Sequence, residues 1–408
     1  MIFEKIKLKD VCSSISDGDH QAPPKATKGV PFVTISNITN TNQFDFSNTM
    51  FVSQEYYDGL DSKRKAQEGD VLYSVVGSFG IPVYIKEAIP FVFQRHIAIL
   101  RPNEDKIVPK FLYYTMLNRD FYMKADAAAL GAAQRTISLT ALRNMEIEIP
   151  HIEVQKKIAE VLYTYDKLIE NNQKQIKLLE EAAQRLYKEW FVDLRFPDHE
   201  DVAIVDGVPE GWKIKPLSEV FAYVRGKSYT SKELVENGGI LMVNLKNIRA
   251  FGGYNRNAEK RYSGKYKEEQ KLNPGDLVMG VTDMTQERRL VGHVAIIPDI
   301  GETMTFSMDL IKLIPLSIQK SFLYATMYFG GYSKKISPLA NGVNVLHLKP
   351  EAMMNMEMLI PTEEIINQYD KIFETYQCRI EILQKQCDLA VEARERLLPK
   401  LMSGEIEV

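Results

Sequence analysis

Several short strings in this chain have residue types that support bond chemistry in other proteins. Gly226-Lys227-Ser228 matches the end of a phosphate-binding loop, but Phe221 stands where that loop needs its first glycine. Pro298-Asp299 and Glu302 resemble part of a nuclease motif, but Met304 occupies the position of its lysine. No Gly-x-Gly-x-x-Gly string follows a predicted strand, and no Asn/Asp-Pro-Pro-Tyr/Phe run is present. We therefore expect the chain to have no catalytic residues of its own.

The metal-binding residue types are also too scattered to predict a site. The six histidines have no His-x-x-x-His or Glu-x-x-His spacing, and Cys12, Cys378 and Cys387 form no Cys-x-x-Cys pair. Three cysteines in 408 residues are typical of a reducing compartment. The charged N-terminus lacks the apolar core of a signal peptide, and the apolar stretch from Phe322 to Tyr332 is too short for a membrane helix. We expect a cytoplasmic protein that binds no metal or cofactor itself.

The charge of the chain is distributed unevenly, although the total is only −3. Residues 212–361 hold 20 basic against 14 acidic side chains, and residues 1–151 hold 17 of each. The acidic excess lies in residues 196–211, with five acidic and no basic side chains, and in residues 362–408, with ten against six. The total charge therefore says little about the surface of any one region, and a nucleic-acid partner is not excluded.

An internal repeat at an offset of about 210 residues organises the chain. The string GVPFVTISNI (29–38) aligns with GILMVNLKNI (239–248), and GDVL (69–72) aligns with GDLV (275–278). Each half is a block of ~150 residues followed by a helical segment of ~40 residues, which indicates a duplicated domain and not a solenoid repeat.

Within each block, short β-branched and aromatic runs alternate with turns rich in Gly, Pro and Asn and with a few helical patches. This pattern predicts an α/β fold of the mixed α+β kind. We predict two similar globular domains, at residues 1–151 and 212–361, with a central helix at 152–195, an acidic linker at 196–211, and a C-terminal helix and tail at 362–408.

Each helical segment has apolar residues in a 4-3 spacing over five heptads, which is typical of a coiled-coil seam. Pro150 and Pro361 precede the two helix starts, and Pro399 is expected to limit the second helix. We expect the two helices to pair with each other, in a direction that periodicity alone does not decide. The seam residues are Ile158, Leu162, Ile169, Asn172, Ile176, Leu179 and Leu186 in the first helix, and Phe373, Ile380, Leu383 and Leu397 in the second.

Asn172 is the polar member of this seam. A buried amide at such a position fixes the register of a coiled coil at some cost in stability. The alternative is an asparagine that is solvated or packs in another way.

The order of blocks and helices, together with several local strings, resembles the specificity (S) subunit of type I restriction-modification systems over essentially the whole chain. The strings are RERLLPKLMSGEIEV (394–408), DGVPEGW (206–212), GDHQAPPKATKGVPFVTISNI (18–38), GSFG (77–80) and GAAQRTISLTALRNMEIEIP (131–150).

This resemblance implies that each block is a target recognition domain for one half of a bipartite double-stranded DNA site. It also implies that the two helices form an antiparallel coiled coil that sets the spacing between the half-sites. The subunit would dock two methyltransferase (M) subunits, and restriction (R) subunits would join the full complex. S-adenosylmethionine, ATP and Mg would then be used by those partners, and none by this chain.

Polar and basic residues in the loops of each block are the candidates for DNA contact, since Arg and Lys recognise guanine while Gln and Asn recognise adenine. The alternative for each is a residue that caps a turn or covers a strand. In the first block the candidates are His20, Gln21, Lys25, Thr27, Lys28, Ser36, Asn37, Ser78, Gln94, Arg95, His96, Gln134 and Arg135. In the second block they are Arg225, Lys227, Ser228, Tyr229, Asn244, Lys246, Gln286, Arg288, Arg289, Ser307, Asn341 and Asn344.

A basic and aromatic segment at residues 254–267 could contact phosphates or form a solvated loop. Two other functions stay open at this point. The chain could be a non-catalytic coiled-coil scaffold whose blocks bind protein, or it could modify DNA itself.

Overall fold

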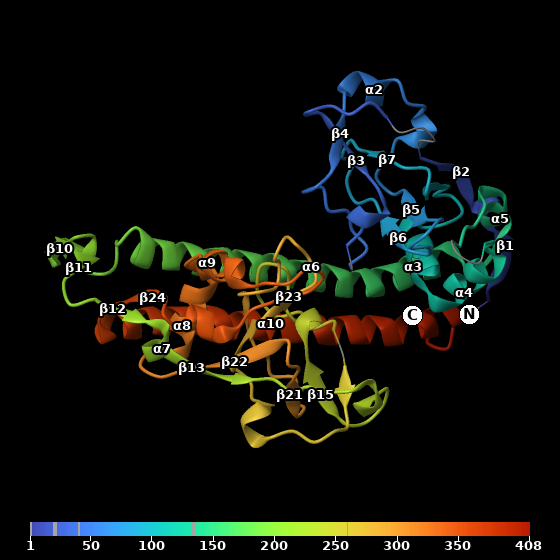
Figure 1. Cartoon of the computed structure of the whole chain (residues 1–408). Coiled ribbons are helices and arrows are strands. Elements are labelled where there is room, and N and C mark those ends of the chain that lie inside the picture. Colours follow the sequence, from blue (N-terminus) through green and yellow to red (C-terminus); the bar gives the residue numbers. More distant parts are fainter. Residues whose placement is uncertain (1, 19–22, 40, 132–134, 259) are drawn as a thin grey trace. The chain divides into compact units, whose positions relative to one another are not determined.

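A computed structural model describes residues 2–18, 23–39, 41–131, 135–258 and 260–408 (Figure 1). The chain forms two compact units. Unit 1 combines Met1–Asn172 with Gln386–Val408, and unit 2 is Gln173–Lys385. Both long helices cross from one unit into the other, so unit 1 is built from two separate parts of the chain.

Unit 1 contains two main sheets, with strand orders β2-β8-β5-β6 and β4-β3-β7, and the pair β1-β9. Its strands are β1 (Glu4–Lys7), β2 (Cys12–Asp17), β3 (Val30–Val33), β4 (Met50–Val52), β5 (Val71–Ser74), β6 (Pro82–Tyr84), β7 (Val92–Phe93), β8 (Ile97–Pro102) and β9 (Glu146–Ile149). Its short helices are α1 (Leu8–Val11), α2 (Gln54–Asp58), α3 (Pro109–Leu117), α4 (Arg119–Ala128) and α5 (Leu139–Asn144). Strand β5 is buried along its whole length, because α3 packs in the same core through Phe111, Leu112 and Tyr114.

Unit 2 contains sheets with strand orders β13-β22-β18-β20 and β14-β16-β15-β21-β17, and the pairs β12-β24, β19-β23 and β10-β11. Its strands are β10 (Ile204–Val205), β11 (Val208–Pro209), β12 (Lys213–Pro216), β13 (Phe221–Arg225), β14 (Leu234–Val235), β15 (Ile240–Val243), β16 (Arg261–Tyr262), β17 (Lys271–Leu272), β18 (Leu277–Gly280), β19 (Thr282–Asp283), β20 (Val294–Ile296), β21 (Met304–Phe306), β22 (Leu310–Pro315), β23 (Leu346–His347) and β24 (Glu357–Ile360). Its short helices are α7 (Leu217–Val220), α8 (Lys320–Phe329) and α9 (Tyr332–Ile336).

The two units repeat the same topology. The order β2-β8-β5-β6 of unit 1 corresponds to β13-β22-β18-β20 of unit 2, and β1-β9 corresponds to β12-β24. The parallel pair β3·β7 likewise corresponds to the parallel pair β15·β21. The predicted duplication of a mixed α/β domain is therefore confirmed.

The long helices α6 (Ile152–Tyr187) and α10 (Glu363–Ser403) pair antiparallel in each unit (Figure 1). In unit 1 the backbone carbonyl of Ile169 accepts a hydrogen bond from Cys387, and Asp166 pairs with Arg394. In unit 2 Arg379 donates to Gln175, while the Tyr187 and Tyr369 rings contact each other. Numbers rise along α6 as they fall along α10, so the direction that the heptads left open is antiparallel.

Most of the predicted seam residues are buried between the two helices or against the adjoining core. Leu179, Leu186 and Leu397 are partly buried, and Leu398 lies deeper than Leu397. The fully buried Asn172 side chain donates a hydrogen bond of 3.1 Å to the Gln386 Oε1 atom across the seam. Because this bond joins one residue of α6 to one residue of α10, it favours a single register.

Asp166 is the carboxylate that joins three elements of unit 1. It lies 2.6 Å from Nη1 of Arg394 on α10 and accepts a 2.5 Å hydrogen bond from the hydroxyl of Tyr114 on α3. Both charged side chains are mostly buried, at 18% and 14% exposed. Breaking such a pair leaves an uncompensated charge in a poorly hydrated place.

We therefore expect Asp166→Ala to lower the free energy of unfolding by about 2–4 kcal/mol. The matched control is Glu153→Ala, which removes an exposed pair with Lys156 on the same helix and should leave the free energy of unfolding nearly unchanged. Urea denaturation of the full chain measures both. Equal losses in the two variants would contradict this role of Asp166.

Candidate nucleic-acid interface

Loops at the ends of several strands of unit 1 converge on one place. The amide of Gln94 donates to the Val33 carbonyl, Val75 donates to His96, and Gly77 donates to Arg135. These bonds gather residues 34–38, 76–80, 94–96 and 135–136, which we call loop cluster 1. Most of the described candidates of the first block lie in it: Ser36, Asn37, Ser78, Gln94, Arg95, His96 and Arg135.

The side chains of loop cluster 1 differ in how free they are. Ser36, Ser78 and Arg95 are exposed, whereas Arg135 pairs with Asp126 and Asn37 accepts a hydrogen bond from the Thr34 amide. Burial lowers the pKa of His96, and the charge of adjacent Arg95 lowers it further. At neutral pH His96 is therefore a neutral imidazole, which can donate one hydrogen bond and accept another. The Arg95 guanidinium is suited to bind an anion or a guanine.

The remaining candidates of the first block lie elsewhere. Lys25, Thr27 and Lys28 are exposed on a segment that runs beside β4, where the Ala26 amide donates to the Phe51 carbonyl. His20, Gln21 and Gln134 lie outside the described residues. Within the described chain, no carboxylate lies within ion-pair distance of Lys25, Lys28 or Arg95, so all three cations are available to phosphates.

Unit 2 contains the corresponding loop cluster 2, formed by residues 226–230, 244–247, 282–289, 307–309 and 341–347. The backbone of Lys227 bonds to Phe306 and to Met308, Ser307 bonds to Val243, and Val281 bonds to Asp309. The Gln286 amide side chain donates to the Val343 carbonyl at 3.1 Å, which joins the loops at 282–289 and 341–347. The exposed or partly exposed candidates here are Lys227, Ser228, Tyr229, Lys246, Gln286, Arg288, Arg289, Asn341 and Asn344.

Several candidates of the second block have structural partners, and among them Arg289 pairs with Glu287. Arg225 lies on β13 and donates twice to Glu351, and hydrogen bonds from Tyr223 and Arg225 lower the pKa of that carboxyl to about 2. Ser307 is buried and donates to Asp309, and buried Asn244 caps the turn that follows β15. Their polar types are explained by these contacts.

The basic and aromatic segment at 254–267 does not form one free surface. Arg256 pairs with Glu381 of α10, Arg261 pairs with Glu302, and Tyr262 is buried. Arg256 therefore attaches the globular part of unit 2 to α10.

The two loop clusters share a backbone but differ in side chains. The turn Gln94-Arg95-His96 makes the same hydrogen bonds to β3 and β5 as Ser307-Met308-Asp309 makes to β15 and β18–β19. Each turn faces a glycine, because a Cβ atom on Gly18 would lie 2.1 Å from the Phe93 carbonyl oxygen, and one on Gly226 would lie 1.9 Å from that of Ser307. Arg95 and Met308 thus occupy equivalent tips.

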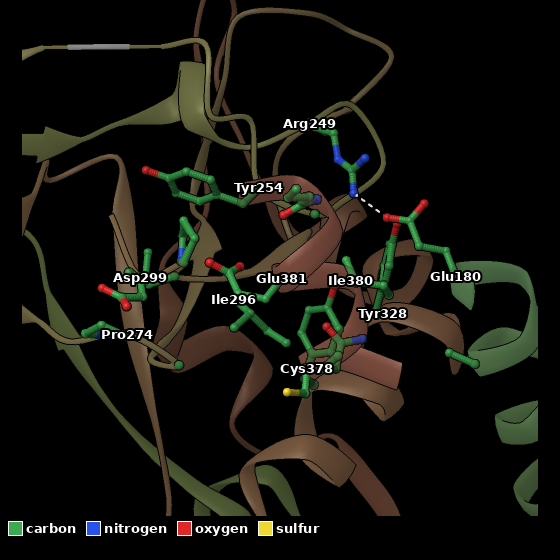
Figure 2. A pocket seen from close by; sticks show the side chains of 18 of the residues that line it. Glu180, Arg249, Tyr254, Pro274, Ile296, Asp299, Tyr328, Cys378, Ile380 and Glu381 are labelled. Carbon is green, nitrogen blue, oxygen red and sulfur yellow. Dashed lines mark hydrogen bonds and ion pairs between the residues drawn. The ribbon is translucent and has the colours of Figure 1, made fainter. Parts of the chain in front are cut away.

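A cavity of unit 2 lies between the globular part of this unit and its helix segments, and loop cluster 2 does not line it. The volume of this cavity is about 280 Å³. Figure 2 shows Arg249 and Glu180 joined at one of its walls. The Arg249–Glu180 distance is 2.9 Å, and the side chains of Tyr254, Tyr328 and Ile380 line the space. We interpret it as an imperfectly filled contact between the globular part and the helix pair.

Within each unit, the globular part contacts one side of that unit's own helix segments. If the seam residues are heptad positions a and d, the contacts fall on positions e and b: Tyr114 on Asp166 in unit 1, and Arg249 on Glu180 and Arg256 on Glu381 in unit 2. Exposed apolar residues lie on the other side, at positions g and c. They are Val161, Leu168 and Leu389 in unit 1, and Leu178, Ile372 and Ile382 in unit 2.

These apolar positions follow the internal repeat. Val161 and Ile372 are 211 residues apart, as are Leu178 and Leu389, which is the same shift that aligns the two seams. In unit 2, Leu178, Leu186 and Tyr376 also line a shallow groove between the helices. The described part of the chain has no helix long and apolar enough to span a membrane and no group of three or more potential metal ligands.

Comparison with known proteins gives one family. The model for a type I restriction modification DNA specificity domain matches twice, at residues 2–181 and 209–392. The MjaIX specificity subunit of a type I restriction enzyme from Methanocaldococcus jannaschii is 27% identical over 75% of this chain and 71% of its own length. A putative MjaX specificity subunit from the same organism is 25% identical over 100% of this chain and 94% of its own.

Two further similarities extend over nearly the whole chain. The type I restriction enzyme HindI specificity subunit of Haemophilus influenzae is 22% identical over 92% of this chain and 95% of its own. The crystal structure of a type I restriction-modification S subunit from M. genitalium superposes with a TM-score of 0.61 at 14% identity, covering 98% of this chain and 96% of that one. The last similarity shows that the fold is shared.

Arg95 gives the sharpest test of loop cluster 1. Selection from a random duplex library should enrich a sequence with a guanine preference that Arg95→Ala abolishes at one position. Arg95→Lys keeps the charge but not the two-pronged guanidinium, so it should weaken this preference while retaining most of the affinity. If both variants enrich the parent sequence unchanged, Arg95 does not contact a base.

Proposed function

Because the chain belongs to the family of type I restriction modification DNA specificity domains, with one copy in each half, we propose that it is the DNA-recognition subunit of such a complex. In this proposal each globular part binds one half of a bipartite DNA site. The helices α6 and α10 set the spacing of the half-sites and carry the methyltransferase subunits.

The observation that carries this proposal is the pair of loop clusters with one backbone and two sets of side chains. A frame built twice with the same hydrogen bonds presents Arg95 at one tip and Met308 at the other. Two loop clusters with the same backbone and different side chains are suited to two half-sites of different sequence, because base discrimination depends on which side chains reach the groove. Exposed cations such as Lys25 and Lys28 would contribute phosphate contacts.

The spacing function follows from the continuity of α6. Its 36 residues span roughly 54 Å at about 1.5 Å per residue, and the helix passes from unit 1 into unit 2 without a break. Antiparallel pairing with α10 and the Asn172–Gln386 bond limit sliding of one helix along the other. Such a helix pair is suited to hold two half-site readers at one distance.

The two exposed apolar patches support the docking of two identical partners. The patches carry equivalent residues, Leu389 in unit 1 and Leu178 in unit 2, at 65% and 64% exposure. Two copies of one partner need two equal docking surfaces, one for each copy. An apolar face on a helix pair is suited to bind an amphipathic helix of that partner. We assign the patches to two M subunits.

The chemistry in this proposal belongs to the partners. M subunits would bind S-adenosylmethionine and transfer its methyl group to DNA, and R subunits would use ATP and Mg when they join. The chain itself would contribute recognition and geometry, and no catalytic group.

Light scattering and methyl transfer together test this function. Mixed with its cognate methyltransferase subunit, the chain should form an assembly of two M subunits per chain that methylates DNA from labelled S-adenosylmethionine, while the chain alone transfers no label. Leu389→Glu and Leu178→Glu should each remove one M subunit, and the double variant should bind none, because a buried unpaired carboxylate opposes docking.

The control for this experiment is Ile89→Glu, an equally drastic change at an exposed apolar residue of unit 1 outside the patches. It should leave two M subunits bound. A parent assembly that saturates at one M subunit would refute the twofold docking, and methyl transfer by the isolated chain would refute the non-catalytic role.

A further inference from the structure

Three large apolar side chains project from loop cluster 2. Val343 is 88% exposed, Met284 is 75% exposed and Met308 is 53% exposed. They stand among polar residues of the same loops, including Lys227, Gln286 and the asparagines at 341 and 344. Exposure of three such residues on one group of loops indicates a binding function, since apolar patches on a protein surface mark sites of contact.

Backbone bonds hold these three residues in place. The Met308 amide donates to the Lys227 carbonyl at 2.9 Å, and Asp283 accepts from the Thr285 and Leu290 amides at 2.8 and 2.6 Å, which shapes the loop that carries Met284. Val343 accepts from Gln286. The three loops meet at the junction of β18 and β19, where Val281 bonds to Asp309 and Leu348. The apolar side chains are thus presented by an ordered frame.

Two of these three positions have polar counterparts in unit 1. Arg95 occupies the tip that Met308 occupies in unit 2, and Ser78 stands three residues after Val75 as Met284 stands three after Val281. In the helix patches, by contrast, the equivalent positions of the two units carry the same residue type, since Leu178 and Leu389 are both leucine. A partner shared by both units needs equal surfaces, whereas two different DNA half-sites need unequal ones. The apolar character of loop cluster 2 therefore fits a half-site better than an M subunit.

We propose that Met284, Met308 and Val343 are specificity-determining residues that contact thymine methyl groups in the half-site bound by unit 2. The C5 methyl of thymine is the apolar group in the major-groove pattern of the bases, and apolar side chains recognise it by contact. Methionine suits this role because its flexible thioether adapts to the position of the methyl group. The assignment rests on the proposed function, since it requires that unit 2 binds DNA in this orientation.

Uracil substitution tests the assignment, because uracil pairs like thymine but lacks the methyl group. The assembly of the chain with its methyltransferase subunits is first used to map the methylated site. Binding is then measured to duplexes in which the thymines of one half-site at a time are replaced by uracil. Each contacted methyl lost should weaken binding roughly fourfold in the half-site of unit 2, and the same replacement in the other half-site should have a smaller effect.

The triple variant Met284→Ala, Met308→Ala, Val343→Ala identifies the residues responsible. It should bind the thymine duplex more weakly than the parent and should no longer distinguish thymine from uracil, as expected for groups that contact each other. The matched control is Leu316→Ala, an exposed apolar residue that follows the other end of β22, and it should keep the full uracil effect.

Three results would overturn the assignment. They are a unit 2 half-site made only of G·C pairs, equal binding of the thymine and uracil duplexes by the parent, and a triple variant that retains the uracil effect. In each of these cases a mapped bipartite site would leave the proposed function standing. A methylation pattern with no bipartite site would refute the proposed function and this assignment together.

Discussion

The antiparallel pairing of α6 and α10 is the constraint on which the rest of the structure depends. Neither globular part has a complete core without it. In unit 1 Leu398, Leu401 and Met402 from the end of the chain pack in one core with Ile158 and Leu162. In unit 2 Tyr187 and Trp190 of the first helical segment pack with Tyr369 and Phe373 of the second. Since each core needs both helices, the pairing ties the globular parts to the element that would measure the DNA site.

Duplication gives the two units the same backbone and helix surface but different side chains at the loop tips. The glycines at 18 and 226, which follow β2 and β13, allow the chain to approach the turns of the two loop clusters closely. The backbone hydrogen bonds of the two loop clusters also correspond. On the helices, Leu178 and Leu389 are alike, as the proposed docking of one kind of partner on both units requires. At the loop tips, Arg95 and Met308 are unlike, as the proposed recognition of two half-sites of different sequence requires.

The sequence predicted the architecture well, because its signals are local and repeated. Heptad spacing predicted both helices and most seam residues, and the Gly29 and Gly239 strings predicted the duplication. Helix direction could not be predicted from periodicity, which is the same for parallel and antiparallel pairs. The α10 helix also continues past Pro399 to Ser403, since the packing of Leu401 and Met402 in the core of unit 1 outweighs the effect of the proline.

The loop residues were harder to predict, because selection by polar type does not show which way a side chain faces. Three of the candidates are polar for structural reasons. Ser307 is a buried hydrogen-bond donor, Asn244 caps a turn, and Arg225 belongs to an ion pair. Met284, Met308 and Val343 were missed because they are apolar, although a repeat alignment that allows small gaps would have placed Met308 opposite Arg95. Loop convergence also depends on non-local pairs such as β3·β7 and β15·β21, which the sequence pattern does not specify.

The central claim is that two independent readers share one helix pair, and exchange of a single reader tests it most directly. Residues 1–151 would be replaced by the corresponding domain of another family member, and methylated sites would be mapped by sequencing in cells that contain the cognate partners. The account predicts that one half-site changes while the other half-site and the number of base pairs between them stay the same. A chimaera that folds and assembles but changes both half-sites would contradict independent reading.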